Sequence, residues 1–134
     1  MTINELIKAI QMSLTPDLLK KKYREGWDKN NPMFGHCYVA TEALYYLLKK
    51  YNMDNYSNYK PCRGRDRYDK GSVHWWLQDD QGNILDPTEA QYTSKGLKPP
   101  YEEGRRGGFL TSKPSNRTEI VVRRVQEKRT RGQT

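Results

Sequence analysis

The stretch from Cys37 to Tyr51 constrains the fold more than any other part of the chain. Its apolar residues recur at the 3.6-residue spacing of an α-helix, and Glu42 and Lys49 lie off the apolar stripe. The stripe consists of Cys37, Ala40, Ala43, Leu44, Leu47, Leu48 and Tyr51. A continuous apolar face must pack against another element, so we predict that this helix is the centre of the core.

A β-hairpin is predicted after this helix. Residues 72–77 alternate as in a strand: Val73, Trp75 and Leu77 fall on one face, and Ser72, His74 and Trp76 on the other. Gly82 suits the left-handed position that closes a three-residue loop at 80–82. That loop pairs Asp79 with Asn83, and it places Asp86 diagonally from His74 on the same face. A slip of one residue would separate the two side chains.

Helices are predicted on both sides of this central region. Thr2 and Glu5 have capping-box spacing before an amphipathic stretch, and Thr15 followed by Pro16 begins a second helix that ends near Gly26. Residues 52–71 form a polar connection with room for a short strand. Residues 115–128 are either a helix capped by Ser115 or Asn116, or a strand, because the segment is β-branched. This order of elements indicates an α+β fold, with a helix on a small antiparallel sheet.

Composition bounds the kind of protein. The chain has 134 residues, 34% of them hydrophobic, and a net charge of +8. We predict one domain over residues 1–127 and a basic flexible tail over 128–134, because no apolar residue follows Val125. The sequence has no apolar stretch of the roughly 20 residues that span a membrane, and its start does not resemble a signal peptide. Two cysteines are too few for a disulfide framework, so a reduced, cytoplasmic protein is expected.

Cys37 has two interpretations. A cysteine on an apolar helix stripe is often a buried core residue. However, if the helix begins near Gly35 or His36, Cys37 lies in its first turn, with Pro32 stiffening the approach. The unpaired backbone N–H groups of a first turn favour a thiolate and can stabilise an oxyanion. The position of Cys37 therefore makes it a candidate nucleophile.

A nucleophilic cysteine requires a base and an acceptor that orients the base. His36 is adjacent in sequence and points about 100° away on a helix, so His74 is the better candidate base. Asp86, on the return strand, is the candidate orienting residue. Each has a simpler explanation: His74 as a partly buried histidine between tryptophans, and Asp86 as a turn residue before proline.

The stretches "NPMFGHCYVATEALYYLL" and "HWWLQDDQGNILDPTEAQY" resemble the papain-like and transglutaminase-like cysteine superfamily, and within it the YunG-like group of bacterial and phage proteins. More weakly, "YEEGRRGGFL" and "VVRRV" extend the similarity, which covers Trp27 to Val125 and leaves the first two helices unexplained. The resemblance implies a papain-like fold with Cys37 as nucleophile, His74 as general base and Asp86 as orienting residue. Papain-like enzymes use a glutamine before the cysteine in the oxyanion hole; here His36 holds that position and is the candidate donor.

Three functions follow from these residues. The first is a thiol peptidase, deamidase or acyl transferase that acts on a protein or peptide substrate without a metal or other cofactor. The second is a papain-like binding module without catalysis. Its partner would be a protein or, less favoured, nucleic acid bound through a basic patch of Arg63, Arg65, Arg67, Arg105 and Arg106. A zinc site from the cysteines and histidines is the weakest alternative, because their spacing matches no zinc motif.

Overall fold

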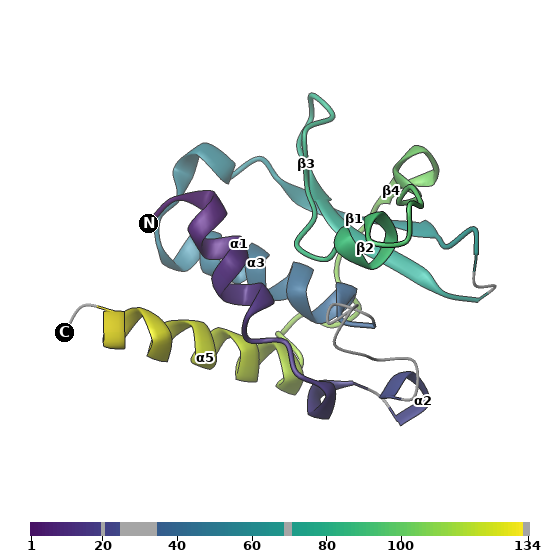
Figure 1. Ribbon diagram of the computed structural model, residues 1–134. Helices are drawn as coiled ribbons and strands as arrows, with labels where there is room; N and C mark the ends of the chain where they lie inside the picture. Colours follow the sequence, from purple (N-terminus) through teal and green to yellow (C-terminus); the bar gives the residue numbers. More distant parts are fainter. Residues whose placement is uncertain (20, 25–34, 69–70, 133–134) are drawn as a thin grey trace.

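The computed structural model describes residues 1–19, 21–24, 35–68 and 71–132. Its α-helices are α1 (Ile3–Gln11), α2 (Lys21–Arg24), α3 (Cys37–Lys50), α4 (Ala90–Thr93) and α5 (Asn116–Gly132). Its strands are β1 (Lys60–Arg65), β2 (Val73–Gln78), β3 (Ile84–Leu85) and β4 (Arg105–Arg106), and its 3-10 helices are η1 (Pro16–Leu18), η2 (Asp54–Tyr56) and η3 (Tyr101–Glu103). Helix α3 packs on the sheet, and α1 and α5 pack on α3 (Figure 1). The predicted α+β class, with a helix on a small antiparallel sheet, is confirmed.

Within the described residues, the sheet has four strands in the order β3-β2-β1-β4, and each neighbouring pair is antiparallel. The predicted register of the hairpin is confirmed: Leu77 pairs with Leu85, and the backbone N–H of Asp79 donates to the carbonyl of Asn83 at 3.0 Å. Gly82 has the expected positive φ of 86°. Strand β1 arises from the polar connection, where a short strand had room to form.

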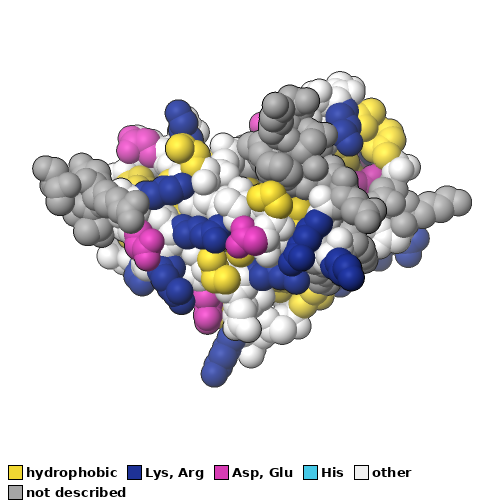
Figure 2. Space-filling view, turned by 60° about the horizontal axis from the view of Figure 1, so that its bottom comes forward, with side chains coloured by type: hydrophobic (Ala, Val, Ile, Leu, Met, Phe, Trp, Pro, Cys, Tyr) yellow, Lys and Arg dark blue, Asp and Glu magenta, His cyan; other side chains and the backbone are white. Residues whose placement is uncertain are grey.

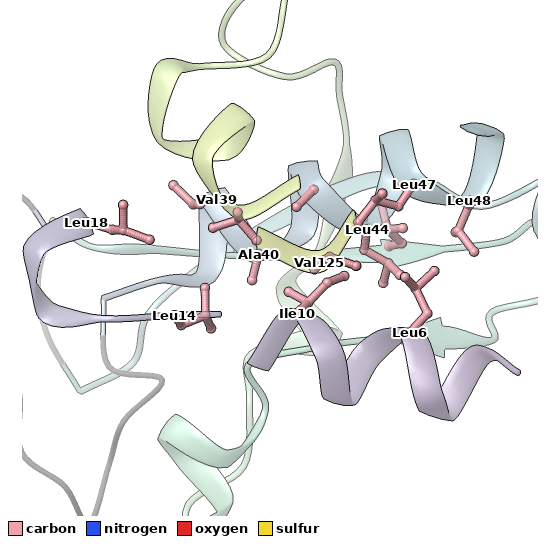
Figure 3. Close-up of a cluster of buried hydrophobic side chains, with 13 residues drawn as sticks. Leu6, Ile10, Leu14, Leu18, Val39, Ala40, Leu44, Leu47, Leu48 and Val125 are labelled. Atoms are coloured by element: carbon pink, nitrogen blue, oxygen red, sulfur yellow. The ribbon is translucent and has the colours of Figure 1, made fainter. Parts of the chain in front are cut away.

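The core lies between α1, α3, α5 and the inner face of the sheet (Figure 3). Leu6 and Ile10 of α1 pack beside Leu44 of α3 and Val125 of α5, and all four are fully buried. Burying a side chain of this size stabilises the fold by roughly 1.5–3 kcal/mol. The hydroxyl of Thr41 on α3 also donates to the backbone carbonyl of Trp75 at 3.1 Å, which fixes the helix against β2.

The capping predictions hold at both ends of the chain. Oγ1 of Thr2 accepts a hydrogen bond from the backbone N–H of Glu5 at 3.1 Å and so caps α1. The final segment is a helix, and the backbone N–H of Thr118 donates to Oγ of Ser115 at 3.2 Å, so Ser115 is its cap. The segment forms a helix and not a strand because Val121 and Val125, four residues apart, then both lie in the core.

Three local expectations differ from the structure. The second predicted helix is divided into η1 and the short α2, and its predicted end at Gly26 lies outside the described residues. Glu42, which lies off the apolar stripe, is completely buried, and its carboxylate accepts hydrogen bonds from polar groups around it. The predicted tail is helical through Gly132: Nζ of Lys128 donates to Oγ of Ser13 at 3.3 Å, and the Arg129 guanidinium lies over the Tyr51 ring.

None of the described helices is both long enough and apolar enough to cross a membrane.

Candidate active site

Cys37 is the first residue of α3. Gly35 precedes it with a positive φ of 76°, a conformation that glycine adopts without strain, and His36 is the N-cap residue. The first N–H to bond within the helix is that of Ala40, which donates to the carbonyl of His36 at 2.9 Å. The N–H groups before it have no acceptor inside the helix, and the half-buried Cys37 lies among them. Pro32, expected to stiffen this approach, and Trp27 lie outside the described residues.

His74 and Asp86 are in direct contact. Nε2 of His74 lies 2.6 Å from Oδ2 of Asp86, and the two side chains are 0% and 1% exposed. The hairpin register explains the contact, because it places Asp86 on the face of β2 from which His74 projects. The predicted proximity of these two side chains on one face is therefore observed.

Asp86 receives further hydrogen bonds that hold its carboxylate in place. The hydroxyl of Tyr101 donates to Oδ2 at 2.8 Å, and the backbone N–H of Thr88 donates to Oδ1 at 3.0 Å. Burial raises the pKa of Tyr101, and the charge of Asp86 raises it further, so the phenol stays protonated and remains a donor. Tyr101 belongs to η3, in a glycine- and proline-rich stretch whose sequence carries no periodic signal.

Gln91 is the other polar partner of the histidine. Its Nε2 lies 2.7 Å from Nδ1 of His74, so both nitrogens of the imidazole have a partner. Sequence reasoning did not single out Gln91. Its signal was its place in "DPTEAQ", where a turn after Asp86 leads into α4 and returns the chain to the histidine.

The surroundings of His74 favour its protonated form. Burial lowers the pKa of the ring, but hydrogen bonds with Asp86 and Cys37 and the charges of both groups outweigh burial and raise it to about 9. A base paired in this way with a cysteine stabilises a thiolate and imidazolium pair. The Sγ atom of Cys37 itself lies 3.5 Å from the backbone carbonyl oxygen of Val73, toward which the thiol donates.

Cys37 opens into a cavity of about 670 Å³. Gln91 lines it as well, so the candidate nucleophile and one partner of the candidate base face the same space. Much of the wall is apolar or aromatic, contributed by Leu18, Tyr38, Val39, Val73, Trp75, Tyr92 and Leu110. A pocket of this size and character suits a ligand with a large apolar group.

Trp76 supports the histidine by stacking on its ring. Its ring stacks on that of His74 with centroids 5.6 Å apart, and its Nε1 donates to Oε1 of Gln78 at 3.0 Å. Gly64 and Gly104 allow this ring to fit. A Cβ at Gly104 would lie 2.4 Å from Cζ2 of the indole, and one at Gly64 would lie 3.0 Å from Cη2.

His36 occupies a different environment from His74. Its ring is 1% exposed, and neither ring nitrogen has a hydrogen-bond partner in the structure described. Burial lowers its pKa to about 4, so the imidazole is neutral at ordinary pH. It is not among the described residues that line the cavity, and its oxyanion role stays a prediction.

The predicted basic patch is partly neutralised. Arg67 pairs with Glu102 and Glu103, and Arg106 pairs with Asp80. Among the others, Arg63 lies over the ring of Trp75, while Arg65 and Arg105 are exposed. On the side where α5 lies, acidic side chains are interspersed among the Lys and Arg side chains (Figure 2).

Cys62 differs from Cys37 in exposure. It is 3% exposed, and burial raises the pKa of its thiol despite the nearby arginines. In the part of the chain that the structure describes, no group of three His, Cys, Asp or Glu side chains is arranged to hold a metal ion.

Comparisons with protein-family models, curated proteins and solved structures find no significant match.

Proposed function

We propose that the protein is a cysteine hydrolase or acyl transferase with a papain-like arrangement, acting on an amide or ester bond. Cys37 is the nucleophile, His74 the general base and Asp86 the residue that orients the base. One observation carries the proposal: a buried histidine–carboxylate pair, with nitrogen and oxygen 2.6 Å apart, interacts with a half-buried cysteine at a helix N-terminus beside a cavity.

In the first step, Nδ1 of His74 takes the proton of the Cys37 thiol, because Nε2 is held by Asp86. The thiolate attacks the substrate carbonyl carbon, a C–S bond forms, and an electron pair moves to the carbonyl oxygen. Unpaired N–H groups in the first turn of α3 donate to that oxyanion. Its collapse breaks the C–N or C–O bond, and the leaving group takes the proton from Nδ1.

In the second step, water or an amine attacks the thioester. Nδ1 of His74 accepts the proton of the attacking group, and the C–S bond breaks as the tetrahedral intermediate collapses. The Cys37 thiolate leaves and regains a proton from the imidazolium. Water gives a carboxylic acid, and an amine gives a new amide, so the acceptor decides between hydrolysis and acyl transfer.

The cavity indicates the kind of acyl group. Val39 and Trp75 line it together with Cys37, so an apolar side chain of a peptide or an apolar acyl chain fits beside the thiol. The alternative function, a catalytically inactive binding module that contacts nucleic acid or a protein through basic loops, has less support, because Arg67 and Arg106 are already paired with carboxylates.

Labelling with iodoacetamide at about pH 6 tests the proposal, with the labelled site read by mass spectrometry. A thiol with the usual pKa of about 8.5 is almost entirely protonated there. We expect labelling of Cys37, loss of most of that labelling in His74→Ala, and little labelling of the buried Cys62, which serves as an internal control.

A chromogenic acyl donor such as 4-nitrophenyl butyrate then tests turnover. Wild-type protein should release nitrophenolate, and Cys37→Ala should not. Labelling only at Cys62, or equal labelling of both thiols that His74→Ala leaves unchanged, would exclude the enzyme and leave the binding module.

A further inference from the structure

Besides the contact between them that helps to raise the pKa of His74, the candidate nucleophile and the candidate base each have a further partner in this structure. The Cys37 thiol donates toward the carbonyl of Val73, 3.5 Å away. Nδ1 of His74 instead lies 2.7 Å from Nε2 of Gln91, which is closer than the thiol is to its acceptor. The ring nitrogen needed to take the thiol proton is therefore also in contact with an amide.

The hydrogen-bond roles follow from the contacts. When the ring of His74 is neutral, Nε2 carries the proton because it faces a carboxylate, so Nδ1 holds a lone pair. The amide nitrogen of Gln91 can only donate, and it therefore fills that lone pair. With the thiol proton directed at Val73, every proton of the neutral pair has an acceptor, whereas the ion pair that the raised pKa of His74 favours places a proton on Nδ1 and removes the acceptor of the Gln91 amide.

We propose that Gln91 is a latch on the base, which occupies Nδ1 of His74 in the free protein and turns to the substrate carbonyl oxygen when substrate enters the cavity. The proposal rests on the proposed function. A substrate carbonyl offers the Gln91 amide a replacement acceptor at the moment when Nδ1 must become available. Binding would thereby release the base, and the same amide would donate to the developing oxyanion.

The position of Gln91 supports this role. Its side chain lines the cavity that Cys37 opens into, so a ligand there meets the amide directly. Its backbone N–H donates to the carbonyl of Thr88 at 3.1 Å, and Thr88 in turn donates to Asp86. The main chain of the latch is thus tied to the residue that orients the base, while the partly buried side chain borders open space.

Two measurements on Gln91→Met test the latch, because methionine keeps the length of the side chain and removes the amide. The first is the rate at which Cys37 reacts with 2,2′-dithiodipyridine at about pH 6. This probe has no carbonyl group, and the thiolate displaces pyridine-2-thione from it. Removing one hydrogen bond from Nδ1 should raise this rate about threefold to tenfold. The second is acylation by 4-nitrophenyl butyrate, which should become at least about tenfold slower without the amide donor.

Opposite changes in the two rates would support the latch, since a residue with a purely structural role would slow both. An unchanged or slower reaction with the disulfide probe would overturn it. Gln81→Met, an exposed glutamine in the hairpin turn, is the matched control and should change neither rate. If Gln91→Met does not fold by circular dichroism, Gln91→Ala takes its place. A wild-type protein that reacts with the probe but not with the ester would refute the proposed function, and the disulfide arm alone would then decide the latch.

Discussion

Oδ2 of Asp86 lies 2.6 Å from Nε2 of His74, and the same oxygen also accepts a hydrogen bond from Tyr101. Because both side chains of the pair are buried, water does not compete for these bonds. The carboxylate is therefore held in place, and the imidazole ring has one orientation, in which Nδ1 lies 2.7 Å from Nε2 of Gln91.

Replacing the carboxylate should deactivate the cysteine. Asp86→Asn keeps the shape of the side chain but removes the charge that stabilises the imidazolium, so the reaction of Cys37 with iodoacetamide at about pH 6 should slow by about tenfold or more. Asp80→Asn in the same hairpin is the control, because Asp80 is exposed and pairs only with Arg106 among the described residues. Equal rates in both variants would contradict the role of Asp86.

The raised pKa of His74 should make stability depend on pH. Burial lowers this pKa, while Asp86 and Cys37 raise it more, from 6.5 to about 9. Since the folded value is the higher one, the stabilisation is fully present below about pH 6.5 and is lost as the pH rises through about 9. Tyr92, whose ring edge meets His74, also has a raised pKa and stays neutral over this range.

Urea unfolding of wild type and His74→Gln at about pH 6 and pH 10 measures this dependence. The stability difference between the two proteins should be larger at the lower pH, by up to a few kcal/mol. A difference that grows with pH would show that folding lowers the pKa of His74 instead.

Gly104→Ala should destabilise the fold by about 1–3 kcal/mol. The new methyl group would lie 2.4 Å from the Trp76 ring and 3.0 Å from Sγ of Cys62, so strand β4 or the indole must move. Gly108→Ala is the matched control, since nothing lies within 4 Å of a Cβ there. Chemical unfolding measures the stability of both variants. Equal stabilities would mean that the residues around the Trp76 ring move aside at little cost in free energy.

Glu42→Ala should cost about 2–4 kcal/mol. The buried carboxylate accepts hydrogen bonds from the backbone N–H of Ser115 at 3.0 Å, from the Thr118 hydroxyl at 2.7 Å and from the Tyr38 hydroxyl at 3.1 Å. Its removal leaves donors unpaired between α3 and α5. Glu127→Ala, at an exposed position of α5, should change the urea midpoint little, and a similar small change for Glu42→Ala would refute this account.

The parts of the site that could be predicted are those that local pattern determines. Alternation in β2 and the turn at Gly82 together determine the register, and the register alone places Asp86 beside His74. Gln91 and Tyr101 could not be predicted in this way, because they lie in short, aperiodic segments that only the folded sheet brings to the histidine.

Contacts between segments distant in sequence also explain the differences at Glu42 and at the C-terminal segment. Glu42 lies off the apolar stripe, and its burial could not be predicted because its partners Ser115 and Thr118 are distant in sequence. The segment from Lys128 was expected to be a basic flexible tail, since no apolar residue follows Val125. Its helix continues instead because Lys128 reaches Ser13 and Arg129 packs on Tyr51, contacts that no local pattern reveals.

His74 lies in β2 and Asp86 directly follows β3 of the same hairpin, whereas Cys37 is the first residue of α3. Hairpins close in about 1–10 μs, before distant elements dock. His74 and Asp86 can therefore meet early during folding, and Cys37 gains His74 as a neighbour only when α3 packs on the sheet. If Cys37 is the nucleophile that we propose, a chain emerging from synthesis or refolding would not have an active thiol until its architecture is nearly complete, and the unfinished protein would be protected from the proposed chemistry.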